Sequence, residues 1–323
     1  MTKIALVGKY PPGTLEAFQA QLAGEDVQFA LVNTPEAYEK LDDADCMVLR
    51  VFKAPRDVIE RNAKLKLLCR WGVGYDTVDI ACAGEKGVMV TNTPGANAYS
   101  VSELAVLLML AVGRNLMFHN KSIQSGVWSR TLFTDNAVTL NAKKVGIVGG
   151  GNIGRQVARK VQAFGAQVQY YDVFRLKPEM EREFAMTYVS LEELVRTSDV
   201  ISLHVPLTED NHHMLDASMI AKMKKNAILV NTARGGLIDD SALLVAIDEG
   251  RLMGAGLDCV EDDPLPAGHP LLNHPNIVIT PHIGGVASDI GEVMIPMISA
   301  NIKRFLHGEK VQYLVNEKEL NTR

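Results

Sequence analysis

The sequence lacks several patterns that would place it in large classes of protein. Its four cysteines include no CxxC pair, and there is no HExxH or GxxxxGK[ST] motif. These absences argue against a cysteine zinc site, a metalloprotease site and a P-loop nucleotide site. His212 and His213 are adjacent rather than four residues apart, so we do not expect them to face one metal ion, and we predict no metal site. Isolated free cysteines are typical of a reducing compartment, so we expect a cytoplasmic protein.

Long apolar runs and an excess of basic charge are also missing. No run of 18 apolar residues occurs, residues 1–8 lack the pattern of a signal peptide, and the 33 basic residues do not exceed the 38 acidic ones. We therefore expect no membrane span and no general binding of nucleic acid, which requires a basic surface. The 323 residues, 47% of them apolar and 22% charged, are enough for two ordinary globular domains.

Short apolar segments alternate with helical patterns from one end of the chain to the other. The first third contains five expected strands, at residues 4–8, 27–32, 46–50, 65–69 and 88–92. Six more follow from Lys144 onward, at 145–149, 167–172, 200–205, 227–232, 254–259 and 276–280. This alternation predicts an α/β fold with doubly wound parallel sheets.

Three helical segments are informative about the organisation of the domains. Residues 100–115 are apolar on most faces, which predicts a helix buried on several sides, as at a domain junction. The helix expected at 290–305 follows the last strand, so we expect it to return to the first domain. Ser190 and Glu193 have the spacing of a capping box and predict the start of a short helix.

Residues 149–154 read Gly-Gly-Gly-Asn-Ile-Gly, so that Gly149, Gly151 and Gly154 satisfy G-x-G-x-x-G. The motif follows an expected strand and opens an expected helix at 153–164, which is the context of a dinucleotide site. In such a loop one glycine forms the tight turn, the next lets the backbone approach the pyrophosphate, and the third lets the helix pack close to the strand.

The next expected strand ends at Asp172, eighteen positions after Gly154. An acid at this place accepts hydrogen bonds from the adenosine ribose and repels a 2′-phosphate. We therefore predict NAD rather than NADP as the cofactor. Arg175, three residues further on, is a nearby cation that weakens this preference.

Chemically useful side chains follow three strands of the second set. Arg234 follows the strand at 227–232, and His282 follows the strand at 276–280. Acidic residues follow the strand at 254–259, and the carboxyl ends of parallel strands meet at one edge of a sheet. Reduction of a 2-keto acid needs a cation for the carboxylate and a proton donor for the carbonyl oxygen, roles that arginine and histidine suit. A carboxylate beside a histidine also favours its protonated form.

We therefore predict a hydride-transfer site with Arg234 and His282. His204 lies inside an expected strand and is the weaker candidate for the acid–base group. None of the eight tyrosines has a lysine four residues later, which excludes the short-chain dehydrogenases.

The chain resembles the D-isomer-specific 2-hydroxyacid dehydrogenases over nearly its whole length. The segments that carry the resemblance are RWGVGYD at 70–76, SVSE at 100–103, the glycine loop, HVPLT at 204–208, NTARGG at 231–236, GLD at 256–258 and TPHIGG at 280–285. The resemblance implies a Rossmann cofactor domain, residues 100–288, inserted into a flavodoxin-like substrate domain, residues 1–99 plus 289–323, with a cleft between them. It also implies a homodimer.

The resemblance further implies the roles of single residues. Arg234 would bind the substrate carboxylate together with the backbone N–H groups of Val73 and Gly74, and His282 would be the acid–base group. The family places a glutamate five residues after the aspartate that matches Asp258, but this chain has Asp263 there and Glu261 two residues earlier, so either acid can be the partner of His282. The implied cofactor-binding residues are Gly149, Gly151, Asn152, Ile153, Gly154, Asp172, His204, Val205, Pro206, Thr208, Thr232, Ala233, Asp258 and Gly284.

We therefore expect an NAD-dependent enzyme that reduces a small 2-keto acid, glyoxylate or hydroxypyruvate first, to the D-2-hydroxy acid. One alternative is a 3-phosphoglycerate dehydrogenase, which is less favoured because no regulatory module follows residue 323. The same fold also hosts oxidation of formate and phosphite, and the remaining alternative is a non-catalytic NADH-sensing binding protein similar to a corepressor. Trp71 and Phe52 are expected to line the far wall of the substrate pocket and to favour a compact or apolar substrate.

Overall fold

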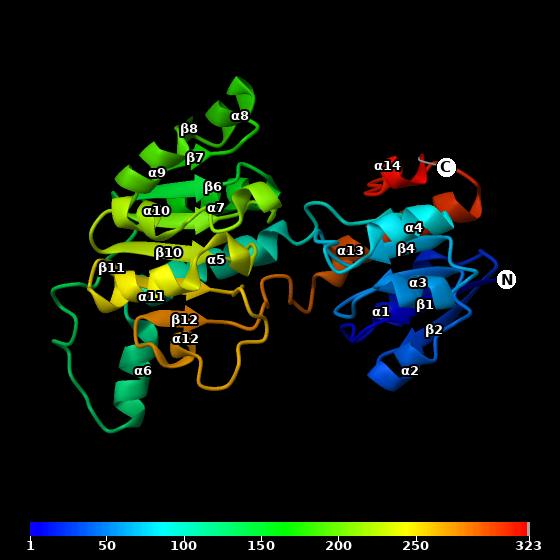
Figure 1. Ribbon diagram of the computed structural model, residues 1–323, viewed down its shortest axis with the longest axis horizontal. Helices are drawn as coiled ribbons and strands as arrows, with labels where there is room; N and C mark the ends of the chain where they lie inside the picture. Colours follow the sequence, from blue (N-terminus) through cyan, green and yellow to red (C-terminus); the bar gives the residue numbers. More distant parts are fainter. Residues whose placement is uncertain (322–323) are drawn as a thin grey trace. The chain divides into compact units, whose positions relative to one another are not determined.

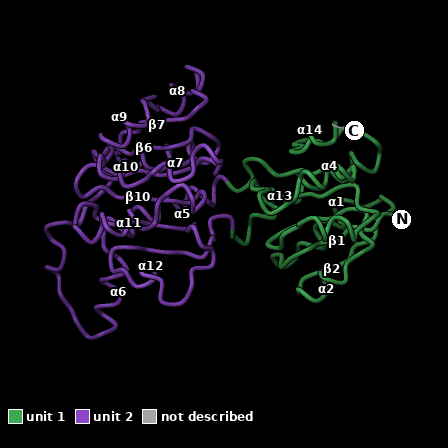
Figure 2. Tube along the Cα trace, viewed as in Figure 1, with its two compact units in different colours: residues 1–97, 286–323 green, residues 98–285 purple. Residues whose placement is uncertain are grey.

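The computed structural model describes residues 1–321, which form two compact α/β units (Figure 1). Unit 1 comprises Met1–Asn97 and Val286–Arg323, and unit 2 comprises Ala98–Gly285 (Figure 2). The chain thus leaves unit 1 after Asn97 and returns to it after Gly285, whereas the sequence analysis placed these boundaries at residues 99 and 288.

Unit 1 contains a parallel five-stranded sheet in the order β2-β1-β3-β4-β5. Its strands are β1 (Thr2–Val7), β2 (Val27–Val32), β3 (Cys46–Leu49), β4 (Leu67–Arg70) and β5 (Met89–Thr91). Its helices are α1 (Thr14–Gln21), α2 (Pro35–Glu39), α3 (Arg56–Arg61), α4 (Ile80–Lys86), α13 (Gly291–Leu306) and α14 (Glu317–Leu320). This strand order is the flavodoxin-like one, as predicted.

Apolar side chains on both faces of this sheet are covered by helices. Phe18 of α1 and Met294 of α13 belong to one buried cluster, and Ile59 of α3 and Cys82 of α4 belong to the other. The last long helix of the chain, expected at 290–305, therefore packs in unit 1.

Unit 2 contains a parallel seven-stranded sheet in the order β12-β11-β10-β9-β6-β7-β8. Its strands are β6 (Lys144–Val148), β7 (Gln167–Tyr171), β8 (Met186–Tyr188), β9 (Val200–Leu203), β10 (Ala227–Asn231), β11 (Leu252–Leu257) and β12 (Ile277–Ile279). Its helices are α5 (Ala98–Gly113), α6 (Leu116–Gln124), α7 (Asn152–Ala163), α8 (Pro178–Glu183), α9 (Leu191–Thr197), α10 (Ala217–Lys222), α11 (Asp240–Asp248) and α12 (Pro270–Asn273), with short 3₁₀ turns η1 (Glu209–Asn211) and η2 (Gly235–Leu237). The strand order is that of a Rossmann fold with one added edge strand, so the predicted fold class is confirmed.

The expected count of six strands in this unit is wrong by one, because β8 was missed. Met186–Tyr188 is only three residues long and lies at the edge of the sheet, where Met186 alone is buried. So short a segment produces no recognisable apolar run.

The helices of unit 2 cover both faces of its sheet. Ala105 of α5 and Val157 of α7 belong to the buried cluster on one face, and Leu194 of α9 and Leu243 of α11 belong to that on the other. Helix α5 is largely buried and begins where unit 2 begins. Among residues 1–321, no single helix is long and apolar enough to cross a membrane, and α5 and α6 reach that length only as a pair bent by 62°.

The predicted cap of α9 is present in part. The Ser190 hydroxyl accepts a hydrogen bond from the Glu193 N–H at 3.2 Å, which satisfies one free donor at the start of the helix. No return bond from the Glu193 side chain is found among the described residues, so this is a simple cap rather than a capping box.

Candidate cofactor and catalytic site

The glycine loop joins β6 to α7, and close contacts explain two of its three motif glycines. Gly149 has a φ of +106°, and a Cβ there would lie 2.6 Å from the carbonyl oxygen of His204. A Cβ on Gly154 would lie 2.0 Å from the carbonyl oxygen of Gly149, so the helix packs directly on the turn. A Cβ on Gly151 would meet nothing within 4 Å, so the backbone here can be approached by a phosphate group.

The first turn of α7 adds a cation that the sequence analysis missed. Arg155 donates from Nη1 to the Gly150 carbonyl at 2.9 Å and from Nη2 to Asn152 Oδ1 at 2.7 Å. The side chain of Ile153 instead packs against the buried cluster, so only its backbone is available to a ligand. A guanidinium beside free N–H groups at a helix N-terminus suits an anionic ligand. The position of Arg155 directly after Gly154 was the signal from which the sequence analysis could have found this residue.

Asp172 follows β7 and is connected to the glycine loop. Its Oδ2 accepts from the Gly150 N–H at 2.7 Å, and its Oδ1 accepts from the Phe174 N–H at 2.9 Å. Each carboxylate oxygen has a second lone pair that a ribose hydroxyl can use. Arg175 is engaged elsewhere, since its Nε lies 2.8 Å from Glu181 Oε1, and this ion pair holds the pKa of Glu181 below its usual range.

Two shielded polar atoms at the same edge of the sheet lack a partner among residues 1–321. His204, directly after β9, bonds through Nε2 to the Ser202 hydroxyl at 2.8 Å, but its Nδ1 has no partner. Thr232, directly after β10, is buried and its Oγ1 has no partner either. Buried polar atoms are normally satisfied, so a dinucleotide bound along this edge fits the residues present. Burial lowers the pKa of His204 to about 3, which keeps the ring neutral and unsuited to donate a proton.

The segment after His204 is exposed but fixed by one side chain. Asn211 accepts from the Thr208 N–H at 2.7 Å and donates to the Pro206 carbonyl at 2.8 Å. Val205 packs against the buried cluster on this face of the sheet. The predicted cofactor residues 205–208 therefore form a short ordered loop at the end of β9.

Arg234 is positioned by a buried asparagine at the end of β10. Asn231 accepts from the Ala233 N–H at 3.0 Å and donates to the Arg234 carbonyl at 2.8 Å, so one amide holds both residues. A Cβ on the following Gly235 would lie 1.9 Å from the carbonyl carbon of Val260, so the loops after β10 and β11 are in direct contact. The sequence analysis included Asn231 only as part of a motif and missed this positioning role.

His282 is carried by a loop that Asp258 organises. The carboxylate of Asp258, which is 2% exposed, accepts from the Thr280 hydroxyl at 2.6 Å and from the N–H groups of Ile283 at 2.8 Å and Gly284 at 2.7 Å. The N–H of His282 donates to the Asp258 carbonyl at 3.0 Å. Both the side chain and the backbone of Asp258 therefore determine where His282 lies.

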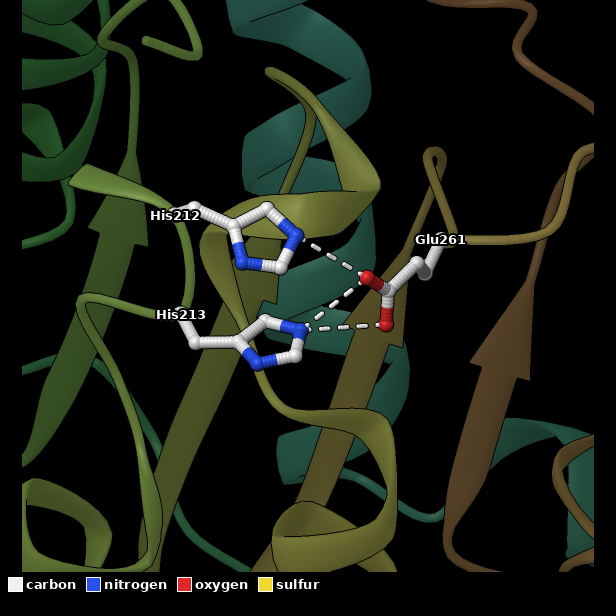
Figure 3. Close-up of side chains that lie close together, drawn as sticks. All are labelled: His212, His213 and Glu261. Atoms are coloured by element: carbon white, nitrogen blue, oxygen red, sulfur yellow. Dashed lines mark hydrogen bonds and ion pairs between the residues drawn. The ribbon is translucent and has the colours of Figure 1, made fainter. Parts of the chain in front are cut away.

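The two acids that the sequence analysis left open lie beside different histidines. His282 Nδ1 lies 3.5 Å from Asp263 Oδ2, and both side chains are about half exposed. Glu261 instead contacts His212 Nε2 at 3.1 Å and His213 Nε2 at 3.0 Å (Figure 3). From their adjacency we did not expect these two histidines to face one metal ion, yet both rings contact the same carboxylate. His213 has a φ of +50°, and this left-handed backbone turns both rings to one side.

The remaining candidate residues belong to unit 1, in the loop after β4. Asn92 Nδ2 donates to the Val73 carbonyl at 2.8 Å and Arg70 Nε donates to the Gly74 carbonyl at 2.9 Å. These bonds hold the loop through its carbonyls, and we find no acceptor within residues 1–321 for the N–H groups of Val73 and Gly74.

The expectation that Trp71 lines a substrate pocket needs correction. Trp71 is 5% exposed and packs edge-on against Tyr10 and Phe18, so it is a core residue of unit 1 and not a pocket wall. Phe52 is half-buried and stacks on Tyr38, with ring centroids 5.0 Å apart. Neither residue supports an inference about the size of the substrate.

Together, the Rossmann strand order, the glycine loop, Asp172 and the unsatisfied atoms after β9 and β10 define a dinucleotide-binding protein. The family model for the D-isomer specific 2-hydroxyacid dehydrogenase, NAD binding domain, matches residues 106–284. The chain belongs to the D-isomer specific 2-hydroxyacid dehydrogenases, which are NAD-dependent enzymes acting on 2-hydroxy acids.

Individual relatives agree with this placement. The chain is 38% identical over 290 residues to a glyoxylate reductase of Thermococcus litoralis, covering 88% of this chain and 87% of that protein. It is 41% identical over 282 residues to a D-3-phosphoglycerate dehydrogenase of Methanocaldococcus jannaschii, covering 87% of this chain but only 53% of that protein. The crystal structure of a glyoxylate reductase from Paecilomyes thermophila superposes with a TM-score of 0.83 at 29% identity, covering 98% of this chain and 99% of that one.

Proposed function

We propose that this protein reduces a small 2-keto acid to the D-2-hydroxy acid with NADH. The observation that carries the proposal is the placement of Arg234, Asp258 and His282. They follow β10, β11 and β12, three neighbouring parallel strands, so all three lie at one edge of the sheet. The unsatisfied atoms of His204 and Thr232 lie at the same edge, where a dinucleotide would bind.

In this proposal each residue has one task. When bound, NADH supplies a hydride to the carbonyl carbon. Arg234 holds the substrate carboxylate with its planar guanidinium, which matches the two carboxylate oxygens. Protonated His282 gives its proton to the carbonyl oxygen as negative charge develops there, so hydride and proton together convert the keto group to a hydroxyl. Asp263 stabilises the protonated ring, and Asp258 keeps the loop of His282 in place.

The finer assignments belong to the same proposal. We assign unit 2 to NAD binding and unit 1 to the substrate, with Val73 and Gly74 binding its carboxylate through their N–H groups. Glyoxylate and hydroxypyruvate are the first candidates, since a similar protein of comparable length is named a glyoxylate reductase. The four free cysteines suit a reducing cytoplasm, and we expect a homodimer.

The test is NADH oxidation with a panel of 2-keto acids that includes glyoxylate, hydroxypyruvate, pyruvate and 3-phosphohydroxypyruvate. We expect turnover of glyoxylate or hydroxypyruvate. His282→Asn should lower kcat/KM by about 10² to 10⁴ while leaving NADH affinity unchanged, because the ring serves the carbonyl oxygen. Arg234→Lys should lose much of kcat/KM, because an ammonium cannot form two parallel hydrogen bonds.

His307→Asn is a matched control, since His307 is also exposed and lies 3.1 Å from an acid, Glu25. It should leave turnover unchanged. If NADH binds but no keto acid is reduced, the protein is a sensor of the corepressor kind and the proposal fails. Selective reduction of the phosphorylated keto acid would instead favour the 3-phosphoglycerate dehydrogenase.

A further inference from the structure

Two histidines and a glutamate outside the proposed reaction meet on the surface of unit 2 (Figure 3). His212 and His213 follow η1, and Glu261 lies in the loop after β11. One ligand atom from each residue lies within 4.8 Å of the other two. We propose that His212, His213 and Glu261 form a binding site for a divalent transition-metal cation of the Zn²⁺ type.

The backbone creates this arrangement. Consecutive side chains of an extended segment point to opposite sides, but the left-handed φ of +50° at His213 brings both rings to one side. The ring centroids are 3.9 Å apart and the rings are tilted by 32°. Left-handed backbone at a residue other than glycine costs free energy, so the surrounding contacts must hold it.

Neighbouring backbone groups hold the two histidines in this position. The His213 N–H donates to the Gly236 carbonyl at 2.7 Å. A Cβ on Gly236 would lie 3.3 Å from His212 Nε2, so glycine lets the ring lie close to the chain. The N–H of Glu261 lies 3.4 Å from Asp240 Oδ2, which holds the third residue from the other side. The site thus joins the segment after η1 to the loop after β11.

The distances between the ligand atoms suit a small cation. Metal–ligand bonds of about 2.0–2.1 Å place neighbouring ligand atoms about 2.9 Å apart in octahedral and about 3.3 Å apart in tetrahedral geometry. Here Glu261 Oε1 lies 3.1 Å from His212 Nε2 and 3.0 Å from His213 Nε2. Both distances lie within a few tenths of an ångström of these values, and the two nitrogens lie within 4.8 Å of each other.

The chemistry of the ligands and their exposure point to the same class of cation. Imidazole nitrogen with carboxylate oxygen is a donor set that Zn²⁺ accepts, and three protein ligands leave room for water. The side chains of His212, His213 and Glu261 are 49%, 32% and 39% exposed, so cation and water can reach them.

The experiment is a zinc titration of untagged protein after removal of metals with a chelator, followed by competition with a zinc indicator. We expect one zinc ion per chain with a dissociation constant below about 100 μM. His213→Asn, which tolerates the left-handed backbone, and Glu261→Gln should each weaken zinc binding at least about tenfold. His307→Asn removes an exposed histidine with an acidic neighbour at another place and should bind zinc as the wild type does.

Circular dichroism of each variant confirms that the fold is retained. Zinc affinity that is unchanged in both His213→Asn and Glu261→Gln would overturn the proposal, because the ion would then be held elsewhere, for example by cysteine. Absence of saturable binding by the wild type would overturn it as well. Neither readout depends on catalytic activity, so the result is independent of the proposed reaction.

Discussion

Asp258→Asn is the substitution that tests the structural basis of the site most directly. In the wild type one carboxylate accepts three hydrogen bonds, with the Thr280 hydroxyl and the Ile283 N–H on Oδ1 and the Gly284 N–H on Oδ2. Asparagine keeps one acceptor oxygen for the first two donors. Its NH₂ group would face the N–H of Gly284, so two donors would point at each other.

The cost follows from these contacts. Loss of one hydrogen bond to a charged acceptor is worth about 1.5–3 kcal/mol, and the two remaining bonds lose their charge. Removal of a buried charge returns part of its desolvation cost, which leaves a net destabilisation of unit 2 of about 2 kcal/mol. Because the loop carries His282, a displacement of about 1 Å should lower kcat by about 10², with a smaller effect on NADH affinity.

Three measurements check this prediction: urea unfolding, steady-state kinetics, and hydrogen exchange at the amides of Ile283 and Gly284. Both amides should exchange faster in Asp258→Asn. Thr280→Val is the matched control, since it removes one donor and leaves the carboxylate bonded to the other two. It should cost about 1.5–3 kcal/mol, as expected for one hydrogen bond to a charged acceptor, but leave both amides protected. If Asp258→Asn has wild-type kcat and amide protection, Asp258 does not hold the loop of His282.

Three further predictions concern single ionisable residues. Asp263→Asn should lower kcat/KM only about two- to fivefold, because Asp263 lies 3.5 Å from His282, both side chains are half exposed, and the attraction between a carboxylate and a protonated ring at this distance in water is about 1 kcal/mol. Glu261→Gln should not lower kcat/KM at all. A hundredfold loss in Asp263→Asn would contradict this reasoning. Asp172→Ser should weaken NADH and improve NADPH relative to it, and a wild type that already prefers NADPH tenfold, about 1.4 kcal/mol, would refute the ribose argument. The folded pKa of His204, about 3, lies below its ordinary value of 6.5, so the unfolded chain binds the extra proton between these values and stability is lost as the pH falls through this window. The free energy of unfolding should fall by at most about 1.4 kcal/mol per pH unit in this window, and His204→Gln should make this dependence weaker. If the variant and the wild type lose stability equally as the pH falls, His204 is not kept neutral by burial.

Local patterns were sufficient to predict the framework of this protein. Alternation of short apolar strands with helices predicted two parallel sheets, and both are present, because buried parallel strands must be continuous apolar runs. The glycine loop and Asp172 lie at the ends of β6 and β7, since the rule that ligands bind at the carboxyl ends of strands needs only the strand positions. The same rule predicted that Arg234 and His282 lie on one edge, and their catalytic roles stay predictions.

Local sequence patterns could not predict the contacts between loops that follow different strands. The spacing after Asp258 left two acids as partners for His282, and only the folded loop puts Asp263 beside it and Glu261 beside other histidines. Trp71 was expected to line the substrate pocket, but its packing against Tyr10 and Phe18 makes it part of the core. Such contacts depend on how separate segments pack, which the spacing of residues does not determine.

What the sequence by itself determined is therefore the alternation of strands and helices, apart from the short edge strand β8, together with the dinucleotide motif and the chemical types of the residues at the strand ends. The tertiary structure alone decided which of these residues touch. The pairing of His212 with His213 shows the physical reason. One left-handed φ angle, held by the bond from His213 to Gly236, reverses the rule that neighbouring side chains point apart. A torsion angle of this kind is set by the surrounding chain and not by the residues that carry it.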